Sequence, residues 1–215
     1  MNDVASMRTS YQRGTLDESS IGGNPLGALE RWILEAREAG ALEPNAFALA
    51  SVSAEGAPSL RFVLCKGVDQ RGITFYTNYE SRKARELEGQ GVAAATFWWD
   101  LLERQVRLEG SVERLPAEES DAYFASRPRG SRVGAWASPQ SRAIADRAEL
   151  EALAAEAEAR FAHGEEVPRP ASWGGYVIKL VAMEFWQGRE NRLHDRLRYE
   201  RDNEEGAWRV VRLAP

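Results

Sequence analysis

The chain has 215 residues, 43% of them hydrophobic and 28% charged, which is the composition of a single globular domain with a core. Its formal net charge of −5 argues against a general nucleic-acid binder. The single cysteine, Cys65, excludes an internal disulfide, and no apolar run is long enough to span a bilayer. Because the N-terminal residues also lack the apolar segment of a secretory signal, we expect a cytoplasmic protein with no membrane or nucleic-acid partner.

The N-terminal part of the chain predicts an arm followed by a helix. Residues 1–23 are polar and rich in Gly and Ser, so we expect a flexible arm there. Asn24 then precedes Pro25 as an N-cap, apolar residues recur at helical spacing, and Gly40 is a plausible stop. Residues 24–215 are expected to form one domain.

The next segments are typical of strands. Five stretches have strand character: AFALASVS (46–53), SLRFVLCKGV (59–68), ITFYTN (73–78), VAAATFWW (92–99) and RQVRLEGSVERL (104–115). A short helix interrupts them at SRKARELEG, with Ser81 as its cap. Short turns between successive strands favour an antiparallel meander or barrel over a parallel sheet.

The C-terminal part is mixed. Residues 117–162 are predicted to be helical in two or three pieces, broken near Pro128 and Pro139. Three closing strands follow, at residues 176–188, 192–202 and 208–215. The expected fold class is therefore α+β, a mostly antiparallel barrel with surrounding helices.

Several familiar catalytic signatures are absent from the sequence. There is no GxGxxG after a strand, no Walker A motif and no GxSxG elbow. One cysteine and two distant histidines, His163 and His194, argue against a zinc site, and we predict no metal. An enzyme with this sequence would depend on an organic cofactor.

The segment RLHDR is the most unusual basic cluster. On a strand, Arg192, His194, Arg196 and Arg198 would share one face and repel one another. Either an anion lies across this row or the row is a solvated face with acidic partners. The candidate partners are Glu184, Glu190, Asp195 and Glu200.

Two further basic clusters occur earlier in the chain. Arg61 and Lys66 are five residues apart, so a regular strand would point them to opposite faces. They could share a ligand only if the strand bends, ends or borders a subunit interface; otherwise they are an edge charge and a turn charge. Arg82 and Lys83 begin a predicted helix, where backbone N–H groups favour anions, although a capped surface helix has the same pattern.

Polar residues of the helical region are weaker candidates. Tyr123, Arg127 and Ser131 stand at i, i+4 and i+8 and share a side if the helix continues through Pro128.

Gln140 and Ser141 are small polar groups that could bind a phosphate or a ring edge. Aromatics such as Trp186, Trp98 and Trp99 are more often part of a core or an interface than a cofactor wall. Residue chemistry alone therefore predicts a barrel with several anion-binding clusters.

Together, these motifs resemble the pyridoxamine 5′-phosphate oxidase family in order and spacing. They are RFVLCK, FYTNYESRKA, LERQVRLEG, YFASRPRGS and EFWQG....RLHDR, and the resemblance covers nearly the whole chain. The last motif is the most specific, whereas SRKA is shared with wider flavin-binding split barrels. The resemblance implies an FMN-binding split β-barrel that works as a homodimer with FMN at the interface. It also implies oxidation of pyridoxamine or pyridoxine 5′-phosphate to pyridoxal 5′-phosphate, with O₂ as acceptor and H₂O₂ as product.

The resemblance also implies roles for individual residues. FMN would be bound by Arg61, Phe62, Val63, Leu64, Cys65, Lys66, Tyr76, Thr77, Arg82, Lys83, Gln105, Trp186 and Arg196, with Gln140 and Ser141 from the partner subunit. Substrate would be bound by Arg8, Tyr11, Lys66, Tyr123, Arg127, Ser131, Arg192, Leu193 and His194. Of these, Arg192 and His194 would be catalytic and lie against the pyridine ring, and Arg196 would favour the anionic reduced flavin.

Three positions, Cys65, Pro139 and Asn191, depart from the family pattern without removing a ligand group. Other functions also remain open. The nearest is another FMN- or deazaflavin-dependent split-barrel oxidoreductase acting on a different heteroaromatic substrate. A non-catalytic carrier of FMN or pyridoxal phosphate is the second, and an arginine-rich nucleic-acid module, disfavoured by the acidic net charge, is the third.

Overall fold

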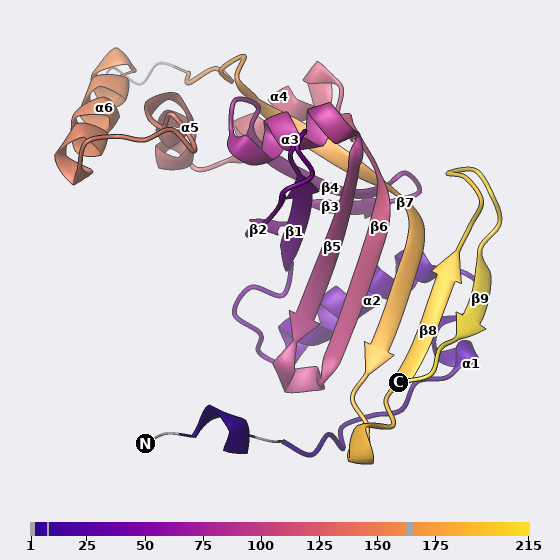
Figure 1. Cartoon of the computed structure of the whole chain (residues 1–215). Coiled ribbons are helices and arrows are strands. Elements are labelled where there is room, and N and C mark those ends of the chain that lie inside the picture. Colours follow the sequence, from indigo (N-terminus) through magenta and orange to yellow (C-terminus); the bar gives the residue numbers. More distant parts are fainter. Residues whose placement is uncertain (1–2, 8, 162–165) are drawn as a thin grey trace.

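One antiparallel sheet forms the centre of the protein (Figure 1). The computed structural model describes residues 3–7, 9–161 and 166–215. The strands follow the order β2-β1-β5-β6-β7-β4-β3, with β8 paired to β7 and β9 to β8. The strands are β1 Ala46–Val52, β2 Pro58–Leu64, β3 Gly67–Asp69, β4 Gly72–Asn78, β5 Val92–Trp99, β6 Arg104–Arg114, β7 Trp173–Gln187, β8 Asp195–Glu200 and β9 Arg209–Arg212. The helices are η1 Val4–Ser6, α1 Glu18–Ile21, α2 Pro25–Glu38, α3 Arg82–Gln90, η2 Asp100–Leu102, α4 Ala117–Ser126, α5 Arg129–Ala137, α6 Arg147–Arg160 and η3 Glu190–Arg192.

Strand β7 is where the barrel splits. Along one edge β7 pairs with β6. Along the other edge, its first half pairs with β4, from Trp173 opposite Asn78 to Ile178 opposite Ile73. Its second half pairs with β8, up to Gln187. The sheet forks along β7 and stays open, so it presents two separate ends.

The main core lies between one face of the sheet and α2, which runs behind the strands in Figure 1. Trp32 of α2 packs edge-on against Phe185 of β7, with ring centroids 5.1 Å apart. Phe47, Phe75 and Phe97 from three other strands are also fully buried. Burying each such side chain stabilises the fold by about 1.5–3 kcal/mol.

A second, smaller core holds α4, α5 and α6, and the last two project away from the sheet (Figure 1). Phe124 and Trp173 pack edge-on there, 5.1 Å apart. The predicted helix α6 is confirmed, yet the only residue that it buries is Ala157.

The α+β, mostly antiparallel prediction is confirmed, while two local predictions need correction. Leu16 and Ile21 are buried and α1 lies within residues 1–23, so this segment is not simply a flexible arm. The predicted strand at RLHDR begins only at Asp195; Arg192 ends η3, with a φ of +62°. In the described part of the chain, no helix has the length and apolarity needed to span a membrane.

Candidate cofactor and substrate site

Many predicted site residues line one cavity of about 500 Å³, here called the cationic pocket. It lies where β2 and β4 meet α3, α4 and α5. Its walls are Arg61, Phe62, Val63, Leu64, Lys66, Tyr76, Thr77, Lys83, Tyr123, Arg127, Pro128, Ser131, Gln140 and Trp173. Four of these side chains are cationic and none is acidic, which suits a phosphorylated ligand.

The end of β2 brings Arg61 and Lys66 to the same cavity. The strand stops at Leu64, and the Lys66 N–H donates to the Thr74 carbonyl 2.8 Å away. Because regular alternation is interrupted there, the two basic side chains need not face opposite sides. A strand that ends is one of the geometries in which Arg61 and Lys66, five residues apart, can share a ligand.

Lys83 lies in the first turn of α3, which Ser81 caps by accepting a hydrogen bond from the Ala84 N–H. Its Nζ donates to Thr77 Oγ1 at 3.1 Å and to Gln140 Oε1 at 3.0 Å. Burial, and secondarily the charge of Arg61, lower the pKa of Lys83 to about 8. A desolvated ammonium at a helix N-terminus is stabilised by a bound anion.

Arg127 supplies an unpaired donor to the cationic pocket. Its guanidinium lies 4.6 Å from the ring centroid of Trp173. Its buried Nη1 has no hydrogen-bond partner among the residues that the structure describes. Burial also lowers the pKa of Arg127. Since buried polar groups are normally paired, this atom indicates a position for an anionic ligand.

The aromatic wall beside Arg127 includes Trp173, which the sequence analysis did not identify as a site residue. Tyr76 and Tyr123 stack with centroids 4.0 Å apart, and Tyr76 stacks on Trp173 at 5.4 Å. Trp173 is separated in sequence from the other members of the wall. It begins β7, three residues before the strand predicted at 176–188, so the strand pattern in the sequence did not include it.

Glu86 of α3 fixes two predicted cofactor residues behind the cationic pocket. It contacts Arg61 Nη2 at 3.3 Å and Arg82 Nε at 2.7 Å. Burial opposes ionisation of Glu86, but hydrogen bonds from Ser51, Ser59 and Arg82 lower its pKa to about 2. Arg82 is therefore engaged outside the cavity rather than among its walls.

A second cavity, of about 600 Å³, lies at the end of the sheet where β7 finishes and is here called the histidine pocket. Its walls come from the N-terminal segment, β7 and the residues around η3. They are Met7, Thr9, Ser10, Tyr11, Trp186, Arg189, Asn191, Arg192 and His194. Arg8, also predicted here, lies outside the described residues.

His194 has a defined orientation. Its Nδ1 accepts a hydrogen bond from the Arg189 N–H at 3.1 Å, so the neutral ring carries its proton on Nε2. Its ring lies 4.6 Å from that of Trp186. Burial, followed by the charge of Arg192, lowers the pKa of His194. The neutral imidazole can therefore donate through Nε2 to a ligand in this pocket.

Three predicted FMN residues form a row across neighbouring strands. Gln105 lies opposite Trp186, and Trp186 lies opposite Arg196. Trp98, 48% exposed, continues the row opposite Gln105. Arg196 is held by a two-pronged contact to Glu184, at 2.8 and 3.1 Å. This contact matches the alternative interpretation of the RLHDR segment, in which its cations have acidic partners.

Other predicted residues lie elsewhere. Cys65 faces the core and is not among the walls of the cationic pocket, and Asn45 binds both its N–H and its carbonyl. Leu193 is exposed and borders a neighbouring cavity, and Ser141 is exposed with a φ of +71°. Gln140, expected from the partner subunit, contacts Lys83 of its own chain.

Comparisons with known proteins agree with the motif resemblance. Residues 33–161 match the family model described as pyridoxamine 5′-phosphate oxidase. Residues 173–215 match the pyridoxine 5′-phosphate oxidase C-terminal dimerisation region. A pyridoxine/pyridoxamine 5′-phosphate oxidase from Salinibacter ruber is 51% identical over 100% of both chains. One of the same name from Burkholderia thailandensis is 54% identical, again over 100% of both.

The chain belongs to the pyridoxamine 5′-phosphate oxidase family. Among solved structures, PhzG from Burkholderia lata 383, in complex with tetrahydrophenazine-1-carboxylic acid, is 34% identical. Its TM-score is 0.87, and the match covers 96% of this chain and 100% of that one. An FMN-binding protein from Nostoc punctiforme, related to pyridoxamine 5′-phosphate oxidase, shares the fold at 17% identity and a TM-score of 0.69.

The residues present fit the flavin that this family implies. The cationic pocket offers the buried, unpaired Nη1 of Arg127 and the desolvated ammonium of Lys83. Trp186 and Trp98 offer aromatic surface at the other end of the sheet, with ring centroids 6.0 Å apart. Two anion-binding groups and a ring-binding surface match the chemistry of a phosphorylated heteroaromatic cofactor.

Proposed function

We propose that this protein is an FMN-dependent oxidase that converts pyridoxamine 5′-phosphate and pyridoxine 5′-phosphate to pyridoxal 5′-phosphate. Oxygen would be the electron acceptor, hydrogen peroxide the product, and the amine substrate would also release ammonia. The observation that carries the proposal is the cationic pocket, where Arg61, Lys66, Lys83 and Arg127 face one cavity. The names of the relatives at 51–54% identity support the same substrate class.

The cationic pocket would bind the phosphates. Lys66, Tyr123, Arg127 and Ser131 would hold the substrate phosphate, and Lys83 would hold that of FMN. Bound FMN would supply the redox chemistry, in which two electrons pass from C4′ of the substrate to oxygen. The protein's contribution is to orient the rings and to exclude water.

The histidine pocket would hold the pyridine ring. Arg192 and the Nε2 proton of neutral His194 would orient the substrate, and Trp186 would provide an aromatic wall. Because this pocket shares no lining residue with the cationic pocket, we propose that each complete site combines the cationic pocket of one subunit with the histidine pocket of its partner. The match of residues 173–215 to a dimerisation region supports this arrangement.

Arg196 is proposed to act differently from a free cation. Glu184, which is 2% exposed, binds it through both oxygens and also contacts Arg107 at 3.5 Å, so two guanidinium groups share one carboxylate. Arg196 would therefore present an oriented guanidinium to the flavin, and Glu184 would moderate its effect on the reduced, anionic ring.

A second candidate function follows from the likeness to PhzG, which was solved with a tricyclic carboxylic acid. The test is to purify the protein, record flavin absorbance and supply each substrate in air. We expect aldehyde and peroxide from pyridoxamine 5′-phosphate at a rate well above that with tetrahydrophenazine-1-carboxylic acid. The reverse preference would support the second candidate, and a protein that binds no FMN would overturn both.

A further inference from the structure

Glu103 occupies an unfavourable position for a glutamate. It lies between η2 and β6, with a φ of +54° in the left-handed region where glycine and asparagine are favoured. It is also 7% exposed, so its carboxylate is largely removed from water. Both features are costly, which indicates that the side chain makes a compensating contact.

That contact is with the N-terminal segment at residues 9–16, here called the strap. The Oε2 atom of Glu103 accepts hydrogen bonds from the backbone N–H groups of Gln12 at 2.8 Å and Arg13 at 2.9 Å. Arg13 Nε lies 4.0 Å from Oε1. Among the described residues, the polar partners of this carboxylate all belong to the strap.

The backbone of Glu103, in contrast, is tied to the sheet. Its carbonyl accepts from the Gly188 N–H at 2.8 Å and from Gln187 Nε2 at 3.2 Å. Glu103 therefore joins the strap to the end of β7. Its side chain binds the strap, and its main chain binds the end of β7.

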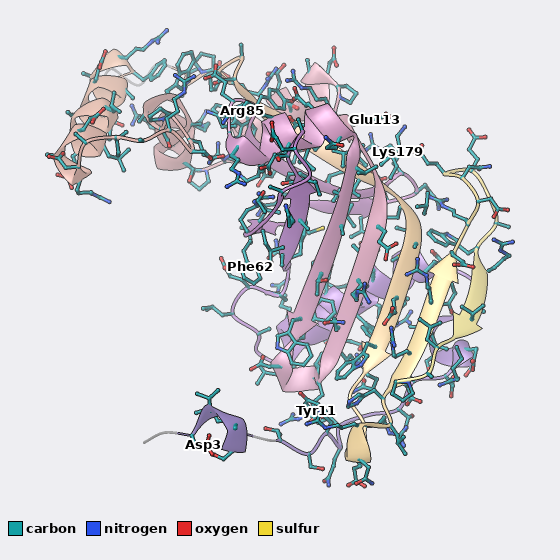
Figure 2. All side chains as sticks on the ribbon, viewed as in Figure 1. Asp3, Tyr11, Phe62, Arg85, Glu113 and Lys179 are labelled. Atoms are coloured by element: carbon teal, nitrogen blue, oxygen red, sulfur yellow. The ribbon has the colours of Figure 1, made fainter. Side chains whose placement is uncertain are left out.

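The clamped amides directly follow Tyr11, a wall of the histidine pocket. The Tyr11 ring lies edge-on to Trp186 and to His194, each at 5.7 Å. A Cβ at Gly188 would lie 2.7 Å from the Tyr11 ring, so the ring rests on the backbone just after β7. Figure 2 shows Tyr11 beneath the turn that joins β5 to β6.

We propose that Glu103 is a positioning residue for the substrate: by clamping the backbone at Gln12 and Arg13, it holds Tyr11 as the outer wall of the histidine pocket. The inference rests on the proposed function in taking that pocket as the substrate site. Glu103 touches no reacting atom. Its loss should weaken substrate binding more than it slows the chemical step.

The first test compares Glu103→Gln with Glu190→Gln in the full-length protein. Within the described ranges, the Glu190 carboxylate accepts from the side chain of Gln12, at 2.5 Å, and not from its backbone, so E190Q leaves the backbone clamp intact. In E103Q, the amides of Gln12 and Arg13 should exchange with deuterium about 10-fold faster, because a neutral amide oxygen is the weaker acceptor. KM for pyridoxamine 5′-phosphate should rise roughly 5- to 10-fold with kcat changed less than about 2-fold. In E190Q, each quantity should stay within about 2-fold of the wild-type value.

The second test is a double-mutant cycle with Tyr11→Ala. If Glu103 acts through Tyr11, E103Q should raise KM little further in the Y11A background. Equal effects of E103Q in both backgrounds, or unchanged exchange at Gln12 and Arg13, would overturn the proposal. If exchange is faster in E103Q but the wild-type protein does not oxidise pyridoxamine 5′-phosphate, the clamp is supported and the proposed function is rejected.

Discussion

Individual charged residues in this protein differ according to whether a protein partner already satisfies them. Arg198 contacts Glu109 at 3.1 and 3.2 Å, and Arg196 is held by Glu184. Arg127 has an unpaired, buried Nη1 within the described residues, and Lys83 has neutral partners only. The pairing state, which residue type alone does not give, separates cations whose charge a carboxylate already balances from cations with no acidic partner among the described residues.

We predict that Arg192→Ala will impair oxidation far more than cofactor binding. Losing a charge-assisted contact to the substrate should lower kcat/KM roughly 10- to 150-fold, while FMN affinity stays within about 2-fold. Steady-state kinetics and fluorescence titration measure the two quantities. Arg198→Ala is the matched control, because Arg198 contacts Glu109 rather than either pocket. Normal turnover in R192A would remove Arg192 from the active site.

The lowered pKa of Lys83 predicts that FMN affinity depends on pH. Its pKa is about 8, compared with an ordinary value of 10.5. FMN affinity should therefore fall as pH rises through 8, since the phosphate is already dianionic there and the ammonium is lost. For folding the sign is opposite. Between pH 8 and 10.5, Lys83 is protonated more in the unfolded chain than in the folded one, so this group makes the free energy of unfolding increase with pH.

The measurement is the Kd of FMN by fluorescence quenching from pH 7 to 9.5. Lys83→Ala should weaken binding at pH 7 by about 10-fold or more and flatten the profile. Lys83→Arg retains a cation throughout and should also flatten it. A wild-type profile that is already flat would mean that Lys83 does not bind the phosphate.

At the scale of elements, the site depends on interruptions of regular structure. The end of β2 brings Arg61 and Lys66 together, and the break at Pro128 separates α4 from α5 while leaving Tyr123 and Ser131 in one cavity. Capping and proline rules predicted several of the helix ends, because a helix end depends on residues that are adjacent in the sequence. The start of β8 was misplaced, since alternation in RLHDR resembles a strand although η3 interrupts it.

Gly110 is predicted to be essential for the pairing of β6 with β7. A Cβ at this position would lie 2.1 Å from the Lys179 carbonyl oxygen, where the register of the two strands shifts. Gly110→Ala should therefore lower the free energy of unfolding by about 3 kcal/mol or more. Gly89→Ala, in α3 with open space around it, should be neutral or stabilise by up to about 1 kcal/mol. Urea denaturation measures both, and equal stabilities would contradict the close contact.

At the scale of the whole molecule, the two pockets lie at different ends of an open sheet and share no lining residue. Large apolar side chains are exposed on two strands of the sheet. Phe62 on β2 is 75% exposed and Trp98 on β5 is 48% exposed (Figure 2 labels Phe62).

Mixing two inactive variants tests the proposed shared site. Arg127→Ala alters the cationic pocket and Arg192→Ala the histidine pocket. If each site draws on both subunits, exchange into heterodimers should restore about 25% of wild-type activity, because half the dimers would carry one intact site of two. Co-expression with two affinity tags isolates the heterodimer by itself, which should then show about 50% of wild-type activity, because one of its two sites is intact. No recovery would place both pockets of a working site in one subunit.

By itself the sequence determined the antiparallel α+β class, the helix limits at Ser81 and Asn24, and the family resemblance, because these follow from residue periodicity, capping and motif order. Only the tertiary structure decided that Trp173 stacks beside Arg127, that Glu86 and Glu184 engage predicted ligand arginines, and that Glu103 holds the strap. Those contacts join residues far apart in the chain or on different elements. Local patterns do not specify such pairings, because burial and strand register set them only once the sheet has assembled.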